Sequence, residues 1–179
     1  MSRKGYLVLS AIGADRPGLV ERISTLIHVS GANLEDSRMA ILGGEFALIL
    51  LLSGDADALA KVEDGGPALE RELDLRISFK PTARKVHAPD YLPYKLKVSG
   101  IDRPGIVSHV SAVLAKRAIN VAAFDSRLSY APLSGTPLFH LHARLQVPSE
   151  VALASLRADV ARLCEEENLD FLLESDDGE

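Results

Sequence analysis

The chain has 179 residues, 47% of them hydrophobic and 25% charged, which is typical of a soluble globular protein with one or two domains. This composition excludes a disordered or collagen-like chain, and no stretch approaches the roughly 20 apolar residues of a membrane helix. The net charge of −5 excludes a polycation that binds nucleic acid through phosphate contacts. A single cysteine, Cys164, excludes an internal disulfide and fits a reducing compartment, so we expect a cytoplasmic protein without a membrane anchor.

The first half of the chain is predicted to alternate strands and helices. Alternating apolar and polar residues predict strands, and apolar residues at helical spacing predict amphipathic helices. These patterns predict strands at 6–12, 33–42, 45–53 and 75–80, and helices at 17–30 and 57–73. We expect the second helix to break at Gly65-Gly66-Pro67, because proline removes a helical hydrogen bond.

One predicted strand of this half has no polar position. Residues 46–52 have the sequence Phe-Ala-Leu-Ile-Leu-Leu-Leu. A strand with one solvated face alternates apolar and polar residues, whereas a strand covered on both faces is apolar throughout. We therefore expect the sheet face away from the helices to be buried against the second half of the chain or against another chain.

Residues 81–93 form the predicted linker. The segment holds three prolines and a small basic cluster, namely Pro81, Pro89, Pro93, Arg84, Lys85 and His87. Proline-rich segments of this kind are commonly solvated connections between domains, and we expect no more of this one.

The second half of the chain repeats the first. The sequence Asp-Arg-Pro-Gly at 15–18 recurs 87 residues later at 102–105, and seven of the nineteen positions that begin there are identical. Later matches show that the second copy carries insertions of two and then four residues. The four fall in 130–137, where two prolines and a glycine predict a longer hairpin loop than Gly43-Gly44 supplies.

The second copy shows the same order of elements as the first. Its patterns predict a strand around 94–99, a helix from Pro104, a hairpin of strands at 120–130 and 138–147, a helix at 149–166 capped by Ser149, and a strand at 169–173. The order predicts an α+β protein of two ferredoxin-like βαββαβ sandwiches, each a four-stranded antiparallel sheet with two helices on one face. The expected domains are 1–80 and 94–174, with the linker between them and an acidic tail at 175–179.

The outer face of the second sheet is predicted to be basic. Alternation places five side chains there together, those of Lys95, Lys97, His140, His142 and Arg144. Such a set favours either a solvated face or an anion-binding patch, and no aromatic side chains are interleaved for stacking on nucleic-acid bases. Because no third metal ligand accompanies the two histidines, we expect no metal site.

The repeated Asp-Arg-Pro-Gly lies between a strand and a helix. The first N–H groups of a helix lack partners and favour an anion, and a glycine there lets a ligand approach the backbone. Asp15 and Asp102 are expected either to cap the helix or to lie beside a bound ligand. Arg16 and Arg103 are expected either to form an ion pair with a carboxylate or to be solvated. The asparagines that open the second strand either form a turn or offer a ligand amide.

Each copy resembles an ACT domain, a small regulatory module that binds amino acids. The resemblance rests on the Asp-Arg-Pro-Gly turn, the aliphatic helix after it and the asparagine at the start of the second strand. It implies a ligand held at an interface between ACT units. The implied ligand-binding residues are Asp15, Gly18, Leu19 and Asn33 in the first copy and Asp102, Gly105, Ile106 and Asn120 in the second. The copies differ after the turn, with Glu21-Arg22 against Ser108-His109, so the two sites need not bind alike.

The resemblance implies a non-enzymatic regulator that binds a small amino acid and signals to a protein partner, including in transcriptional control. It also implies a homodimer, and we expect neither a cofactor nor a metal. We expect no direct contact with nucleic acid. The alternatives are a dimerisation module without a ligand and the regulatory subunit of a metabolic enzyme. An enzyme is disfavoured because Ser24, Ser111, His28, His109 and Cys164 form no evident set of nucleophile, base and orienting acid.

Overall fold

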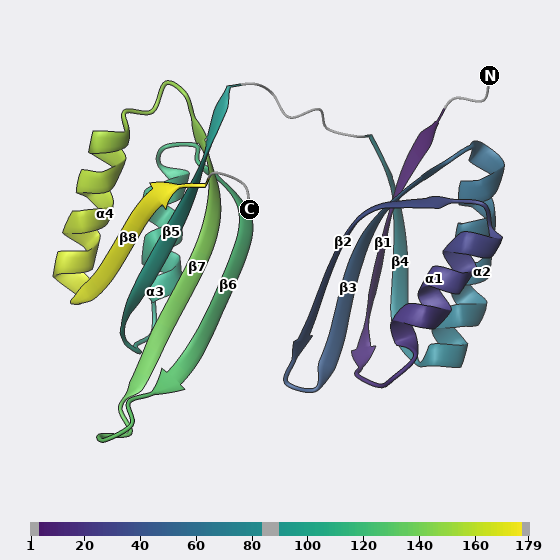
Figure 1. Cartoon of the computed structure of the whole chain (residues 1–179), viewed down its shortest axis with the longest axis horizontal. Coiled ribbons are helices and arrows are strands. Elements are labelled where there is room, and N and C mark those ends of the chain that lie inside the picture. The colour runs from purple at the N-terminus through teal and green to yellow at the C-terminus, as the bar shows by residue number, and fades with distance from the viewer. Residues whose placement is uncertain (1–3, 84–89, 177–179) are drawn as a thin grey trace. The chain divides into compact units, whose positions relative to one another are not determined.

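The computed structural model describes residues 4–83 and 90–176, and the chain divides into two compact units, Met1–Val86 and His87–Glu179 (Figure 1). The first unit contains β1 (Gly5–Ala14), α1 (Leu19–Val29), β2 (Asn33–Leu42), β3 (Glu45–Gly54), α2 (Ala56–Leu73) and β4 (Leu75–Thr82). The second contains β5 (Tyr91–Ile101), α3 (Ile106–Ala115), β6 (Asn120–Tyr130), β7 (Pro137–Pro148), α4 (Leu153–Glu167) and β8 (Leu169–Ser175).

Both units have the predicted α+β architecture. The strand order is β2-β3-β1-β4 in the first sheet and β6-β7-β5-β8 in the second, and all strand pairs are antiparallel. Both helices of each unit cover one face of its sheet (Figure 1). The βαββαβ order and the ferredoxin-like sandwiches predicted from the repeat are confirmed.

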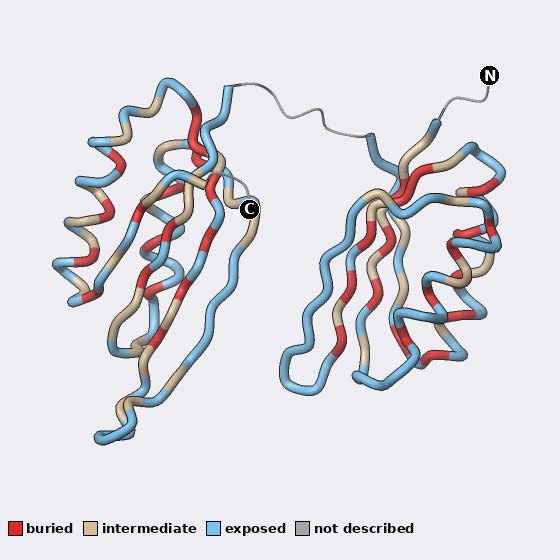
Figure 2. The backbone as a smooth tube through the Cα atoms, in the orientation of Figure 1, coloured by how far each residue is buried: buried red, intermediate tan, exposed pale blue. Residues whose placement is uncertain are grey.

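Each unit has its own hydrophobic core between the sheet and the two helices (Figure 2). Alternate residues of the central strands point inward, so Leu9 and Leu52 in the first unit and Leu96 and Leu141 in the second are fully buried. The helices contribute every third or fourth residue, as Ile23 does in α1. The two periodicities that predicted the elements are therefore those that build the two cores.

The predicted linker is longer than the segment between the two sheets. Pro81 and Thr82 continue β4, and residues 91–93 begin β5, where Pro93 is paired with Gln146 of β7. Pro81 lies at the end of the edge strand β4, where a missing backbone N–H is tolerated. The basic cluster of Arg84, Lys85 and His87 lies outside the described residues, as does the end of the predicted acidic tail.

The predicted break in the second helix is wrong. α2 runs without interruption through Gly65, Gly66 and Pro67. A Cβ at Gly65 would lie 2.4 Å from Cδ1 of Leu26, and one at Gly66 would lie 2.3 Å from Cε2 of Phe79. The glycines therefore let α2 approach α1 and the sheet closely, and this packing outweighs the hydrogen bond lost at Pro67.

The predicted cap of the last helix is also wrong. α4 begins at Leu153, with Ala152 as its N-cap, rather than at Ser149. The N–H of Ser149 donates to the carbonyl of Asp90 at 2.8 Å, and the N–H of Val151 donates to the carbonyl of Pro148 at 3.0 Å. These bonds tie the segment to the start of β5 as a turn, so the helix starts one turn later.

The apolar strand β3 is buried on one face only within its unit. Phe46, Leu48, Leu50 and Leu52 point toward the helices and are buried, whereas Ile49 on the opposite face is 49% exposed. The first unit thus leaves the outer face of its sheet uncovered. Its burial against another part of the chain or another chain stays a prediction.

Candidate functional site

The Asp-Arg-Pro-Gly turn of the first unit leads from β1 into α1. The N–H of Asp15 donates to the carbonyl of Gly44 at 2.9 Å, which fixes the turn beside the β2–β3 hairpin. Gly18 is the N-cap of α1 with φ 96° and ψ −10°, a left-handed conformation that favours glycine. A Cβ at Gly18 would meet nothing within 4 Å, so the space above the start of the helix is open.

The second unit builds the same turn between β5 and α3. The N–H of Asp102 donates to the carbonyl of Pro137 at 3.0 Å, and Gly105 caps α3 with φ 101° and ψ −15°. Here the turn is partly covered, because a Cβ at Gly105 would lie 3.1 Å from Cε1 of His109. The two turns therefore differ in structure: the space beside Gly18 is open, whereas the imidazole of His109 lies beside Gly105.

The predicted N-cap role of the aspartates is wrong. Gly18 and Gly105 occupy the cap positions, and no side chain caps either helix. The first backbone N–H groups of α1 and α3 consequently have no intrahelical acceptor and remain suited to an anion. Both helices also start two residues after the proline rather than at it, since the left-handed glycine ends the turn.

Leu19 and Ile106 follow the cap glycines, and each is only 2% exposed. Their side chains belong to the two cores, so only their backbone N–H groups can face a ligand. The structure thus brings together Asp15, Gly18 and the backbone of Leu19 in one turn, and Asp102, Gly105 and the backbone of Ile106 in the other.

Asn33 and Asn120 lie away from these turns within their own units. Asn33 pairs with Ser53 and Ser53 with Tyr6, at the opposite end of β1 from Ala14. Ala14 lies eight residues after Tyr6 along the strand, a distance of about 26 Å at ~3.3 Å per residue. Asn120 is placed in the same way, and its Nδ2 donates to Oε1 of Gln146 at 2.6 Å. The turn and the asparagine of one unit therefore cannot hold the same small ligand.

An ionic contact in the first unit joins the start of α1 to the end of α2. Nε and Nη2 of Arg22 each donate to a carboxylate oxygen of Glu72 at 2.7 Å, and Nη2 of Arg16 donates to the carbonyl of Glu72 at 3.1 Å. The hydrogen bonds from Arg22 lower the pKa of Glu72 and raise the pKa of Arg22. This contact ties the turn to the second helix of the unit.

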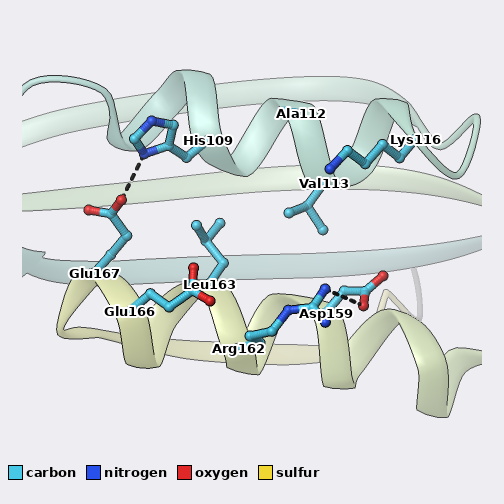
Figure 3. A pocket seen from close by; sticks show the side chains of 9 residues that line it. All are labelled: His109, Ala112, Val113, Lys116, Asp159, Arg162, Leu163, Glu166 and Glu167. Atoms are coloured by element: carbon cyan, nitrogen blue, oxygen red, sulfur yellow. Dashed lines mark hydrogen bonds and ion pairs between the residues drawn. The ribbon is translucent and has the colours of Figure 1, made fainter.

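The second unit makes a similar contact with a histidine (Figure 3). Nδ1 of His109, the counterpart of Arg22, lies 2.8 Å from Oε1 of Glu167, and Nε of Arg103 lies 3.7 Å from Oε2. In both units, therefore, the arginine of the turn and a residue of the first helical turn converge on a glutamate at the end of the second helix.

A groove of about 370 Å³ runs between α3 and α4, with this contact at one end (Figure 3). Its middle is apolar and includes Val113 and Leu163. At the far end Asp159 accepts from Arg117 at 2.5 Å and from Arg162 at 3.1 Å, and the hydrogen bond from Arg117 lowers the pKa of Asp159. The carboxylates of Asp159 and Glu167 thus already have partners: Glu167 connects α4 to α3, and Asp159 connects α4 to Arg117, just after the end of α3.

Glu35 lies beside Asn33 at the far end of the first sheet. Its Oε1 accepts from Nζ of Lys4 at 2.7 Å, from Oγ of Ser53 at 2.5 Å and from Nδ2 of Asn33 at 3.3 Å. These bonds, led by the one from Lys4, lower the pKa of Glu35 from 4.5 to about 2. The amide of Asn33 is thus oriented by a carboxylate that stays ionised.

This contact predicts a pH dependence of stability. The pKa of Glu35 is lower in the folded than in the unfolded chain, so its contribution is present above about pH 4.5 and disappears as the pH falls toward 2. We expect Glu35→Gln to lower the free energy of unfolding in urea at pH 6 and to have less effect at pH 2.5. Glu45→Gln, on the same sheet, is the control, and an equal loss at both pH values would contradict the prediction.

The other predicted chemical features are placed as follows. Cys164 is 2% exposed, and burial raises its pKa to about 11, so it is a protonated core residue at neutral pH.

On the outer face of the second sheet, Lys95 pairs with Arg144 and Lys97 with His142 in the strand register, which confirms the shared basic face. Ionic contacts to β8 and to the residue after it partly neutralise this face: Lys97 pairs with Glu174 at 3.0 Å and Lys95 with Asp176 at 2.8 Å.

Two further findings concern residues 4–83 and 90–176. Within this part of the chain, no three or more histidine, cysteine or acidic side chains are grouped as they are around a metal ion. None of the helices seen there has the length and apolar character needed to cross a membrane.

Comparisons with known proteins identify the family of this chain. The ACT domain family model matches residues 5–80. The glycine cleavage system transcriptional repressor of Escherichia coli (strain K12) is 33% identical over 168 residues, 94% of this chain and 88% of that protein. The chain belongs to the ACT-domain family.

Two solved structures share the whole ACT pair. A crystal structure of an unknown protein from Galdieria sulphuraria is 34% identical and matches with a TM-score of 0.85, covering 97% of this chain and 99% of that one. A candidate glycine cleavage system transcriptional repressor of known structure is 29% identical, with a TM-score of 0.73, covering 97% and 98%. The chain is thus a regulatory ACT-domain protein related to that repressor.

The contacts at the ends of α2 and α4 were not predicted from the sequence of this ACT pair. Glu72 lies fifty residues after Arg22, and Glu167 lies 58 residues after His109, so no local spacing joins them. The difference between Arg22 and His109 was visible in the repeat, but only the fold shows that both side chains reach a glutamate in the last turn of the second helix.

Proposed function

We propose that this protein is a non-enzymatic regulator that binds a small amino acid at its Asp-Arg-Pro-Gly turns and signals to a protein partner. The observation that carries the proposal is the pair of left-handed glycines, Gly18 and Gly105, at helix starts without a side-chain cap. Such a helix start offers backbone N–H groups and a positive dipole to the carboxylate of an amino acid.

The ligand is held where ACT units meet. Because a turn and the asparagine of its own unit are about 26 Å apart (~3.3 Å per strand residue), the amide that completes a site belongs to a neighbouring unit. Occupancy then favours one arrangement of units over another, which is how binding is transmitted to a partner. The protein acts as a cytoplasmic homodimer, without a cofactor and without direct contact with nucleic acid.

The regulated process is transcriptional control of amino-acid metabolism, with glycine as the first candidate ligand. The name of the Escherichia coli relative supports this choice, and so does the similarity over 94% of the chain. The open turn at Gly18 binds more strongly than the turn at Gly105, because His109 covers the latter and must move when a ligand enters.

Thermal melts with each amino acid at millimolar concentration test the proposal. We expect one or two amino acids to raise the melting temperature, since a ligand at 100 times its Kd adds about 2.7 kcal/mol to the free energy of unfolding. Val20 and Val107 are exposed residues of the first helical turns, so Val20→Glu with Val107→Glu puts a carboxylate beside each site without disturbing a core.

We expect this double variant to fold and to lose the shift, because its carboxylates repel that of the ligand and occupy the helix dipole. Val29→Glu, at an exposed position at the other end of α1, is the matched control and keeps the shift. The proposal fails if no amino acid stabilises the protein, or if the double variant responds as the unmodified chain does.

A further inference from the structure

The first unit binds a primary ammonium group, that of its own Lys4, at the start of β2. Nζ of Lys4 donates to Oε1 of Glu35 at 2.7 Å and lies 5.8 Å from the centre of the Tyr6 ring, which allows a cation–π contact. The same carboxylate oxygen accepts from the side chains of Ser53 and Asn33. We call Asn33, Glu35 and Ser53 the acceptor cluster.

A β-bulge places the carboxylate in this cluster. The register of β2 against β3 shifts between Leu34 and Asp36, which leaves Glu35 without a cross-strand partner. Such bulges redirect a side chain and are common next to active sites. The hydroxyl of Ser53, a residue only 1% exposed, fixes one oxygen of the carboxylate. The carboxylate is therefore oriented in advance, and a group that binds it loses little free energy to ordering.

The acceptor cluster has capacity for a further ammonium group. Within residues 4–83 and 90–176, no group donates a hydrogen bond to Oε2 of Glu35 or to Oδ1 of Asn33. An ammonium group has three N–H donors. Together with Oε1 of Glu35, these two oxygens provide three acceptors for them once Lys4 has left.

The second unit differs at the corresponding place. The bulge of β6 falls at Ala122, the counterpart of Glu35, so a methyl group stands where the first unit has a carboxylate. Gln146 takes the place of Ser53, and its Oε1 accepts from Nδ2 of Asn120 at 2.6 Å. The asparagine of the first unit thus lies beside an anion, whereas that of the second unit is bonded to a neutral amide.

A free amino acid needs both kinds of partner. Its carboxylate suits the N–H groups at the helix starts, but those groups only donate and cannot bind its ammonium group. The acceptor cluster supplies the missing acceptors, and a neighbouring unit brings the turn. Asp15 and Asp102 are alternative acceptors within the turns. The cluster is favoured because the structure shows an ammonium group bound to it.

We propose that Glu35 binds the α-ammonium group of the amino acid, in the place that the ammonium of Lys4 occupies in the structure, so that Lys4 competes with the ligand. Lys4 is suited to leave, because it precedes β1 and its side chain is 55% exposed. The inference rests on the proposed function and names the ammonium subsite of that site. It assigns one such subsite to each chain, beside Asn33 and not beside Asn120.

Calorimetric titration of the full chain, with each amino acid that raises its melting temperature and glycine first, tests the subsite. We expect Glu35→Gln to raise the Kd at least about tenfold, since charge-assisted hydrogen bonds become neutral ones. We expect Lys4→Met to lower the Kd about two- to fivefold, because an exposed ion pair no longer competes. Asp64→Asn and Lys61→Met, the same charge changes at exposed positions of α2, are the matched controls and leave the Kd unchanged.

The N-acetyl derivatives of the same amino acids test the subsite on the unmodified chain. They keep the carboxylate and the side chain but have no ammonium group, so we expect their Kd to be at least about tenfold higher. If no amino acid binds, the proposed function and the inference fail together. If amino acids bind, the inference alone fails when Glu35→Gln or the N-acetyl derivatives bind as tightly, or when Lys4→Met binds no more tightly.

Discussion

We expect Leu50→Ala to lower the free energy of unfolding of the first unit by about 2–5 kcal/mol, the range for removing a buried leucine side chain. Leu50 is 5% exposed and points from β3 into the core. Its neighbour Ile49 points to the outer face and is 49% exposed, so Ile49→Ala should change stability by about 1 kcal/mol or less. Urea denaturation of both variants measures the difference.

The pair also reports on the outer face of the first sheet. If another chain covers that face in solution, which is one of the two partners that the uniformly apolar strand predicts, Ile49→Ala becomes costly at high protein concentration and remains mild at low concentration. If Leu50→Ala were as mild as Ile49→Ala at low concentration, the assignment of inner and outer faces along β3 would be wrong.

Gly13→Ala is expected to destabilise the protein by about 1–3 kcal/mol, the usual range for overpacking. A Cβ at Gly13 would lie 2.8 Å from Cδ2 of Leu75 and 2.9 Å from the carbonyl oxygen of Asp74, the residue that ends α2 in a left-handed conformation. The backbone at this point cannot yield easily, because Leu75 begins β4 and pairs with Gly13.

Gly5→Ala in the same strand is the control for Gly13. Its Cβ would first meet Cδ1 of Leu59 at 3.1 Å, the end of a flexible side chain that can shift. Chemical denaturation should therefore show a smaller loss for Gly5→Ala. Similar losses for both would mean that the loss of glycine itself, rather than the contact with Asp74, sets the effect. The second unit repeats the arrangement at Gly100, where an added Cβ would lie 3.2 Å from the carbonyl oxygen of Asn168.

The fold was predictable because local patterns and the internal repeat agree. Period-two alternation predicted that Leu141 and Leu145 lie on the buried face of β7, and helical spacing predicted the buried face of α3. The error at Pro67 arose because proline and glycine were judged by propensity alone. Their effect is decided by Leu26 and Phe79, which lie far away in the sequence and pack onto the two glycines.

The candidate site was only partly predictable. The Asp-Arg-Pro-Gly turns were found from the sequence, but the cap at Gly18 depends on a backbone angle that residue type alone does not fix. The separation of Asn33 from Asp15 was implied by the predicted order. A strand–helix–strand connection returns the chain to the other end of the sheet before the second strand begins. The contact between Arg22 and Glu72 could not be predicted from the sequence, since it depends on how α1 packs on α2.

The duplication within one chain has a consequence for how the two ACT units evolve. In a dimer of single-unit chains every substitution appears twice, so a residue that suits one unit is imposed on the other. Here the apolar Ile49 and the polar His142 occupy equivalent strand positions in the two units. A two-glycine hairpin in the first unit corresponds to a longer hairpin loop in the second. Covalent linkage thus frees each unit from the symmetry of the pair, so a substitution can change one unit and leave the other as it is.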